Sequence, residues 1–201
     1  LGGDLYEMAR DTDKLRILLA DIKGHGINAA LSAMLVKSEW MHSGHMNMDP
    51  GAALTEFNRQ IMARYPRALV LSAFVADVGN GSLGYASAGH LDQYWKDGEV
   101  LVPLRASGAP LGLLTEATYV TERLPWRSTS RLLLFTDAMT EEMDSQGNEA
   151  GSIWIEEIFK KQPGSSYVIA QTLLQKFKSR TGREPGKTTD DLTLIVLAAA
   201  D

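Results

Sequence analysis

Residues 70–88, VLSAFVADVGNGSLGYASA, decide the fold class of this chain. Two apolar runs, 70–78 and 82–88, lie on either side of Asn80-Gly81, a dipeptide that favours positive φ in a two-residue turn. The pattern predicts an antiparallel hairpin. Further strand-like runs follow at 94–102, which contains Asp97-Gly98, at 119–124 and at 131–135. The middle of the chain is therefore predicted to be an antiparallel meander.

Helical patterns lie on both sides of this meander. Apolar residues recur at helical spacing in 27–40 and 50–64 before it and in 153–161 and 167–178 after it. A strand-like run at 14–22 precedes the first helix, and the run 192–197 is predicted to be a buried strand. Helices grouped together and strands grouped together indicate an α+β fold with largely antiparallel sheets covered by helices.

The composition of the chain excludes several classes of function. The 201 residues fit one domain, 1–201. The net charge of -5 argues against nucleic acid as a partner, because such binding needs a basic surface. Since the chain has no cysteine, any metal ligands must be oxygen or imidazole groups, and a thiol nucleophile is excluded.

The chain also lacks a sequence signal for membrane insertion. No stretch approaches the roughly 20 apolar residues that span a bilayer, so we expect a cytoplasmic protein without direct membrane contact. Because the chain begins abruptly with Leu1-Gly2-Gly3-Asp4, we expect it to be the C-terminal part of a longer regulatory protein. One or more N-terminal strands would then be missing, and a homodimer would form through upstream domains.

Carboxylates stand at the edges of apolar segments in four distant places: Asp4, Asp21, Asp137 and Asp190-Asp191. Side chains at the ends of rigid elements can gather at a loop-lined rim, and Mg²⁺ and Mn²⁺ prefer such oxygen ligands. Each aspartate also has an ordinary structural alternative, as a turn residue, a loop hydrogen-bonder, a helix N-cap or a solvated charge. The residues alone leave both interpretations open.

Six segments follow one another along the chain: GGDLYE (2–7), DIKGHG (21–26), SAGH (87–90), GAPLG (108–112), FTDAMTE (135–141) and DDLT (190–193). In this order they resemble the motifs of the metal-dependent PPM-type protein serine/threonine phosphatases, and in particular the bacterial SpoIIE/RsbU-like branch. The resemblance covers essentially the whole chain. It implies an α-β-β-α sandwich, in which two packed antiparallel β-sheets are flanked by helices.

The resemblance also implies a site with two metal ions, Mn²⁺ or Mg²⁺. Asp21 corresponds to the carboxylate that bridges both ions, and the other implied ligands are Asp4, the carbonyl of Ile22, Asp137, Asp190 and, as a neighbouring contact, Asp191. Two cations about 3.5–4 Å apart can lower the pKa of a shared water and neutralise phosphoryl oxygens. His25 is expected to orient that water or to protonate the departing oxygen.

The implied function is hydrolysis of phosphoserine or phosphothreonine on a protein. By resemblance, the substrate is a phosphorylated regulator of the anti-sigma-factor antagonist type in a partner-switching pathway. The alternative is a non-catalytic PPM-like module that binds a regulator or adaptor. A nuclease is disfavoured by the acidic balance.

Three residues depart from the family pattern without removing an implied ligand: Glu7, Lys23 and Ala138. Their effect on metal affinity stays open. Among the other histidines, His90 is expected to be a structural hydrogen-bonder, and His42 and His45 are expected to form a solvated surface pair.

Overall fold

The computed structural model describes residues 2–24, 26–66, 68–105, 108–144, 146–184 and 187–199. The chain divides into two compact units. The first contains Leu1–Leu91 and Arg105–Trp126, and the second contains Asp92–Leu104 and Arg127–Asp201.

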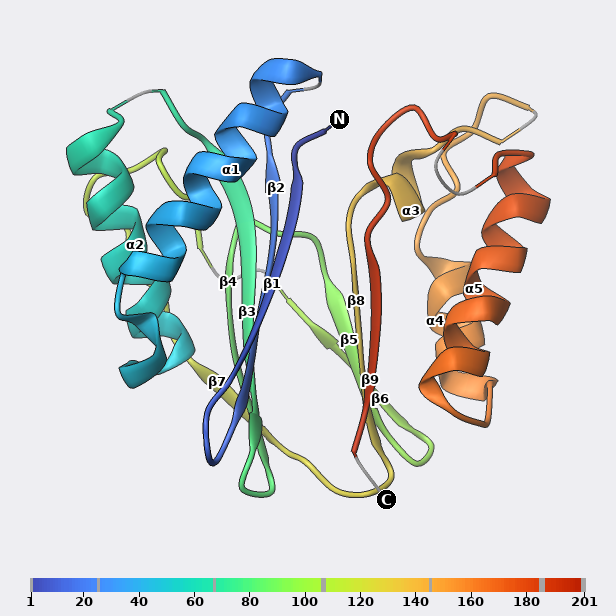
Figure 1. The fold of residues 1–201 in the computed structure, drawn as a ribbon. Coiled ribbons are helices and arrows are strands. Elements are labelled where there is room, and N and C mark those ends of the chain that lie inside the picture. The colour runs from blue at the N-terminus through green and yellow to red at the C-terminus, as the bar shows by residue number, and fades with distance from the viewer. Residues whose placement is uncertain are drawn as a thin grey trace. The chain divides into compact units, whose positions relative to one another are not determined.

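The first unit is built on an antiparallel sheet with the strand order β1-β2-β3-β4-β7. Its strands are β1 (Asp4–Arg10), β2 (Leu15–Ile22), β3 (Leu71–Gly79), β4 (Ser82–Ala88) and β7 (Glu122–Pro125). Its helices are α1 (Ile27–His42), the short 3₁₀ helix η1 (His45–Asn47) and α2 (Pro50–Arg64). Both α-helices lie on one face of this sheet (Figure 1).

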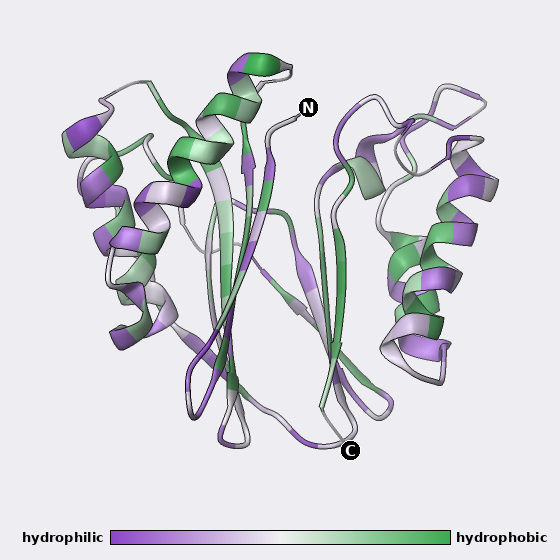
Figure 2. Cartoon of the chain, viewed as in Figure 1, coloured by the Kyte–Doolittle hydropathy of each residue, from purple (hydrophilic) through white to green (hydrophobic). Residues whose placement is uncertain are grey.

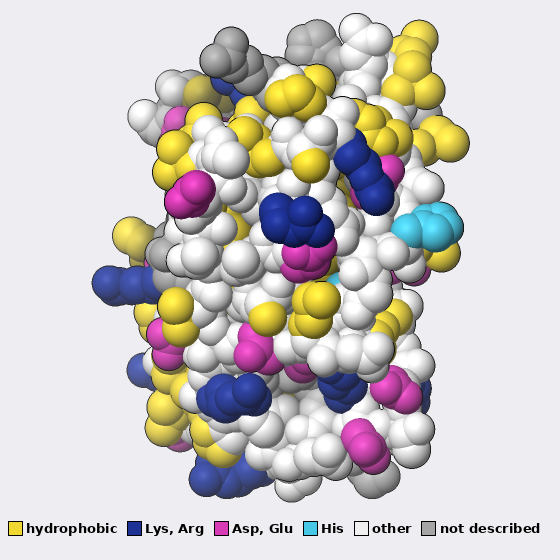
Figure 3. Space-filling model, turned by 90° about the vertical axis from the view of Figure 1, so that its left-hand side faces the viewer, with side chains coloured by type: hydrophobic (Ala, Val, Ile, Leu, Met, Phe, Trp, Pro, Cys, Tyr) yellow, Lys and Arg dark blue, Asp and Glu magenta, His cyan; other side chains and the backbone are white. Residues whose placement is uncertain are grey.

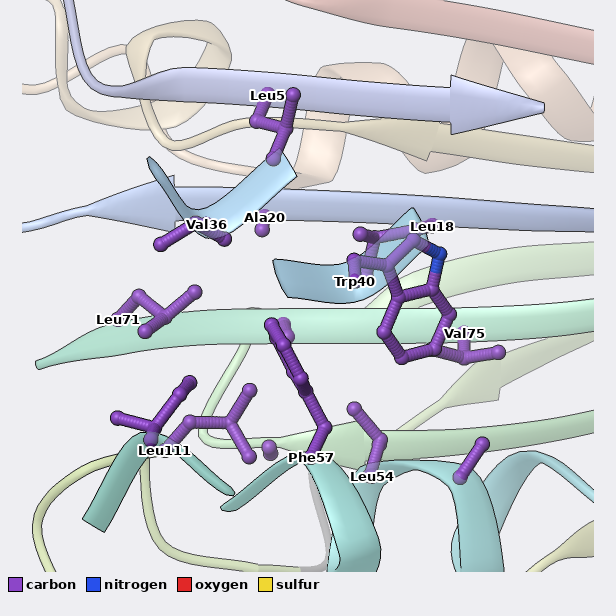
Figure 4. Packing of buried hydrophobic residues seen from close by; sticks show 14 of the residues in the cluster. Leu5, Leu18, Ala20, Val36, Trp40, Leu54, Phe57, Leu71, Val75 and Leu111 are labelled. Carbon is purple, nitrogen blue, oxygen red and sulfur yellow. The ribbon is translucent and has the colours of Figure 1, made fainter. Parts of the chain in front are cut away.

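The core of the first unit lies between α1, α2 and this sheet face. Figure 4 shows Trp40 and Phe57, from the two helices, pointing toward strand residues such as Leu18 and Val75. The Trp40 and Phe57 rings meet edge to face with centroids 5.1 Å apart. Burial of such large apolar side chains contributes about 1.5–3 kcal/mol each, which is what holds the helices on the sheet.

Capping and turn residues set the start of helix α2 and the turn between β3 and β4 at the positions that the sequence predicts. The side chain of Asp49 accepts a hydrogen bond from the N–H of Ala52 at 2.9 Å, and Pro50 begins α2, so the helix has its predicted bounds. Asn80 and Gly81 take positive φ values of 49° and 71°, which confirms the predicted turn between β3 and β4.

The second unit is built on a smaller antiparallel sheet with the strand order β6-β5-β8-β9. Its strands are β5 (Gln93–Asp97), β6 (Val100–Leu104), β8 (Ser130–Phe135) and β9 (Leu194–Ala198). Its helices are α3 (Ala138–Glu141), α4 (Ile153–Lys161) and α5 (Ser166–Thr181). Figure 2 shows hydrophobic residues concentrated on strands β8 and β9 and a mixture of hydrophobic and hydrophilic residues on α4 and α5, as amphipathic helices require.

The predicted α+β class with antiparallel sheets and helices is confirmed, with three differences in detail. Strand β1 was not predicted. The strand expected at 119–124 begins only at Glu122, whereas the Tyr119 ring is buried and its hydroxyl donates to the Ala109 carbonyl at 2.8 Å. Strand β9 is only partly buried, because it lies at a sheet edge, so the expectation of a buried strand is wrong there.

Across the described ranges, none of the helices is long and apolar enough to cross a membrane.

Candidate metal centre

Asp4 and Asp21 lie opposite each other where β1 begins and β2 ends. They are Cα partners in the antiparallel register, so both side chains leave the sheet on the same face. Both residues are half-buried. Two carboxylates in directly opposite positions present oxygen atoms on one face of the sheet, which is the kind of donor that Mg²⁺ and Mn²⁺ prefer.

Gly3 lets the chain before β1 approach the end of β2 closely. A Cβ atom on Gly3 would lie well under 3.0 Å from the carbonyl oxygen of Ile22, and 3.4 Å from Oδ1 of Asp21. The Ile22 N–H also donates to the Gly3 carbonyl at 3.2 Å. The glycine of the first motif therefore leaves room for the carbonyl of Ile22, which is the predicted main-chain ligand.

Asp137 stands in the second unit between the end of β8 and the start of α3. It occupies the N-cap position of α3, but its side chain makes no capping hydrogen bond within the described residues. Its main-chain carbonyl accepts from the N–H groups of Thr140 and Glu141, both at 2.8 Å. The carboxylate is therefore not committed to the N-cap role that was one structural alternative.

Burial and the negative charge of Asp190, in that order, raise the pKa of Asp137 above its usual value. Asp190 and Asp191 lie in the loop before β9, where the Asp191 N–H donates to Oδ1 of Asp190 at 2.8 Å. Glu141 is a further carboxylate that the charges of Asp137 and Asp190 affect, and the sequence did not predict this. Burial is the largest cause that raises the pKa of Glu141, and the charges of Asp137, Glu149 and Asp190 raise it further. A bound cation would offset all of these repulsions.

The predicted ligands thus form two pairs, Asp4 with Asp21 in the first unit and Asp137 with Asp190 in the second. No group of three or more His, Asp or Glu side chains that could hold a metal occurs among the residues that the structure describes. His25 lies outside the described residues. The donor set fits Mg²⁺ or Mn²⁺ because it consists of carboxylate and carbonyl oxygens alone.

The histidines in the described part of the chain have different roles. His90 is buried, and its Nδ1 lies 2.7 Å from the Ser72 hydroxyl, which confirms its structural role. His42 is exposed, with its Nδ1 2.6 Å from the Ser38 carbonyl. His45 is 6% exposed and stacks on Trp40 with ring centroids 4.1 Å apart, so the expected surface pair is wrong for His45.

The three departures from the family pattern have separate locations. Glu7 forms an ion pair with Lys37 at 2.7 Å, Lys23 is exposed, and Ala138 is buried beside Asp137.

A groove of about 450 Å³ follows β1 and is lined by Asp4, Leu5, Tyr6, Glu7, Met8 and Lys37. One predicted ligand, Asp4, therefore lies in the wall of an open groove.

Solved structures identify the fold to which this arrangement belongs. The SiaA-PP2C domain of Pseudomonas aeruginosa matches with a TM-score of 0.86 at 22% identity, over 99% of this chain and 81% of that domain. RsbX in complex with magnesium matches with a TM-score of 0.71 at 20% identity, over 98% of this chain and 86% of that chain. The chain therefore has the fold of PP2C, that is PPM-type, phosphatase domains.

The sequence comparisons define the family within this fold. The profile of stage II sporulation protein E (SpoIIE) matches residues 11–199, and the chain belongs to the SpoIIE family. It is 24% identical to phosphoserine phosphatase RsbP and 25% identical to phosphoserine phosphatase RsbU, both of Bacillus subtilis strain 168, over 82% and 98% of this chain. The chain spans 41% of RsbP and 59% of RsbU.

Proposed function

We propose that this chain is the catalytic domain of a metal-dependent protein serine/threonine phosphatase. The observation that carries the proposal is that a SpoIIE-family chain has Asp4, Asp21, Asp137 and Asp190 at or near the ends of strands, paired within each unit. A protein that only bound a partner would have no need to bring these carboxylates together in pairs.

Two divalent ions, Mn²⁺ or Mg²⁺, are the proposed cofactors. Asp21 would bridge them, Asp4 and the carbonyl of Ile22 would bind one, and Asp137 and Asp190 would bind the other with Asp191 beside them. When bound, such ions lower the pKa of water and neutralise phosphoryl oxygens. The chain's own contribution is to hold the oxygen ligands, with Gly3 leaving space beside Ile22. His25 is proposed to hold or deliver a proton at the departing oxygen.

The proposed substrate is a phosphorylated regulatory protein of the anti-sigma-factor antagonist type, in the cytoplasm. The relatives RsbP and RsbU are phosphoserine phosphatases, which supports a phosphoprotein over a nucleic acid. The groove along β1 supports an extended protein segment as the ligand, because it follows a strand and opens beside Asp4.

A phosphopeptide assay tests this function. The chain is expected to release phosphate with Mn²⁺, to lose this activity in EDTA and to regain it on adding Mn²⁺. Asp21→Asn and Asp137→Asn are expected to be inactive, whereas Asp13→Asn, an exposed loop residue between β1 and β2, should behave as wild type. Full activity of either ligand variant would rule out the proposed site.

A second candidate is the non-catalytic interaction module, and one surface favours it. Helix α1 exposes Ile27, Leu31, Met34 and Met41, each at least 59% exposed. Figure 3 shows hydrophobic side chains between charged ones on the side of the molecule where α1 and α2 lie. Large apolar side chains exposed along one helix are a feature of interaction surfaces. Isothermal titration that detects no Mn²⁺ binding, together with tight binding of a regulator, would favour this function over hydrolysis.

A further inference from the structure

The loop that carries Asp190 and Asp191 has no regular secondary structure of its own. It connects the region after α5 to β9, and both aspartates project from irregular backbone. A ligand on a loop binds a metal tightly only when neighbouring groups fix the loop in place. Hydrogen bonds hold this loop at both of its ends.

One end of the loop is held by Glu142, a residue that the family motifs do not include. The Glu142 side chain is only 1% exposed. Its Oε2 accepts two hydrogen bonds from Thr189, from the N–H at 2.9 Å and from the hydroxyl at 3.0 Å. Thr189 directly precedes Asp190. Because the acceptor is a buried carboxylate, both bonds are charge-assisted and stronger than bonds between neutral groups.

The other end of the loop is held by Thr136, which directly precedes Asp137. The Thr193 N–H donates to the Thr136 hydroxyl at 2.9 Å, and the Thr136 N–H donates to the Thr193 carbonyl at 3.1 Å. Thr136 is fully buried. The segment with Asp137 and the segment with Asp190 are thus joined on both sides of the two aspartates.

We propose that Glu142 is a positioning residue that, together with Thr136, fixes the Asp190 loop against the Asp137 segment so that both carboxylates can bind one metal ion. This inference rests on the proposed function. The two carboxylates repel each other, so a loop without these anchors would relax away from Asp137. Glu142 acts through Thr189 and contacts neither substrate nor metal.

A purely structural role is the competing explanation, because Glu142 also pairs with Arg183, whose Nε lies 3.3 Å from Oε1. The two roles depend on different atoms. Arg183 is 49% exposed in its side chain, so Arg183→Gln removes a largely solvated partner and leaves both bonds to Thr189. Thr189→Val removes only the hydroxyl bond, and Thr189→Ser restores it.

The decisive experiment measures Mn²⁺ binding by isothermal titration and amide hydrogen exchange of 189–193 in the metal-free protein. Glu142→Ala is expected to weaken Mn²⁺ binding about 10- to 100-fold, as removal of outer partners of metal ligands does. Thr189→Val should weaken it by a smaller factor and speed exchange in the loop. Thr189→Ser, Arg183→Gln and the control Thr172→Val, at a half-buried threonine on α5 whose hydroxyl also donates a hydrogen bond, should match wild type.

Each result supports or overturns the positioning role. Wild-type Mn²⁺ affinity and wild-type loop exchange in Thr189→Val and Glu142→Ala would overturn it. If Glu142→Ala does not fold, Thr189→Val against Thr189→Ser still decides, because these changes are small and lie on the exposed side of the contact. If the wild-type chain binds no Mn²⁺, the proposed function fails, whereas exchange in the metal-free variants still tests whether Glu142 fixes the loop.

Discussion

Buried His45 makes the stability of this fold dependent on pH. The side chain is 6% exposed, stacks on Trp40, and its Nδ1 has no hydrogen-bond partner among the described residues. Burial and the nearby Arg16 guanidinium lower its pKa from 6.5 to about 4; Lys14 lowers it further, and Asp77 and Glu7 act in the opposite direction. The folded protein therefore keeps this histidine neutral where the unfolded chain protonates it.

The sign and size of the effect follow from this difference. Because the folded pKa is the lower one, the stabilisation is fully present above pH 6.5 and is lost as the pH falls toward 4. At about 1.4 kcal/mol per pKa unit, the whole loss is about 3 kcal/mol, and about 2 kcal/mol of it has occurred at pH 5. This loss is a large share of the 5–15 kcal/mol that is typical of a domain.

Urea unfolding at pH 8, 6 and 5 measures the effect when wild type is compared with His45→Phe. Phenylalanine keeps an aromatic ring against Trp40 but does not titrate. The difference in unfolding free energy between the two proteins should shift by about 2 kcal/mol in favour of the variant between pH 8 and pH 5. His42→Phe, at an exposed position, should show no such shift. A difference that stays constant for His45→Phe would refute the reasoning.

Two further substitutions test local geometry. Gly3→Ala should weaken Mn²⁺ binding and lower the melting temperature, since the added Cβ would collide with the Ile22 carbonyl. Gly84→Ala is the matched control, because a Cβ there would have no neighbour closer than 3.5 Å. Equal effects of the two substitutions would contradict this account. Asp49→Ala should cost about 1 kcal/mol of unfolding free energy in urea, because the N–H of Ala52 loses its capping acceptor. An unchanged stability would show that water replaces the cap without loss.

The sequence predicted best those elements whose signals are local. Helix α2 begins at Pro50 after the capping Asp49, and its apolar face repeats at helical spacing, so its bounds could be read directly. Strand β1 was not predicted because its hydrophobicity does not follow its burial: Tyr6 and Met8 are exposed at a sheet edge, whereas Glu7 between them is half-buried. Its pairing comes from β2. Only the tertiary partner distinguishes such a segment from a loop.

The residues of the candidate site also fall into those that the sequence predicts and those that only the folded structure shows. Asp21 and Asp137 could be predicted as site residues because each belongs to one of the six family motifs, and the order of these motifs can be seen in the sequence itself. The role of Glu142 could not be predicted, because its partner Thr189 is 47 positions away and becomes a neighbour only in the folded chain. His45 was misassigned for a related reason: spacing from His42 suggested a surface pair, whereas the turn after α1 carries the ring beneath Trp40.

The pairing of the aspartates follows from antiparallel topology. In an antiparallel pair, the end of one strand lies beside the start of its neighbour, so residues distant in sequence become adjacent. Asp4 opens β1 beside Asp21 near the end of β2, and Asp137 follows β8 beside the loop that opens β9, where Phe135 pairs with Leu194. One rule thus accounts for a carboxylate pair in each unit. In each unit, one carboxylate of the pair lies near the start of a strand and the other near the end of its antiparallel neighbour.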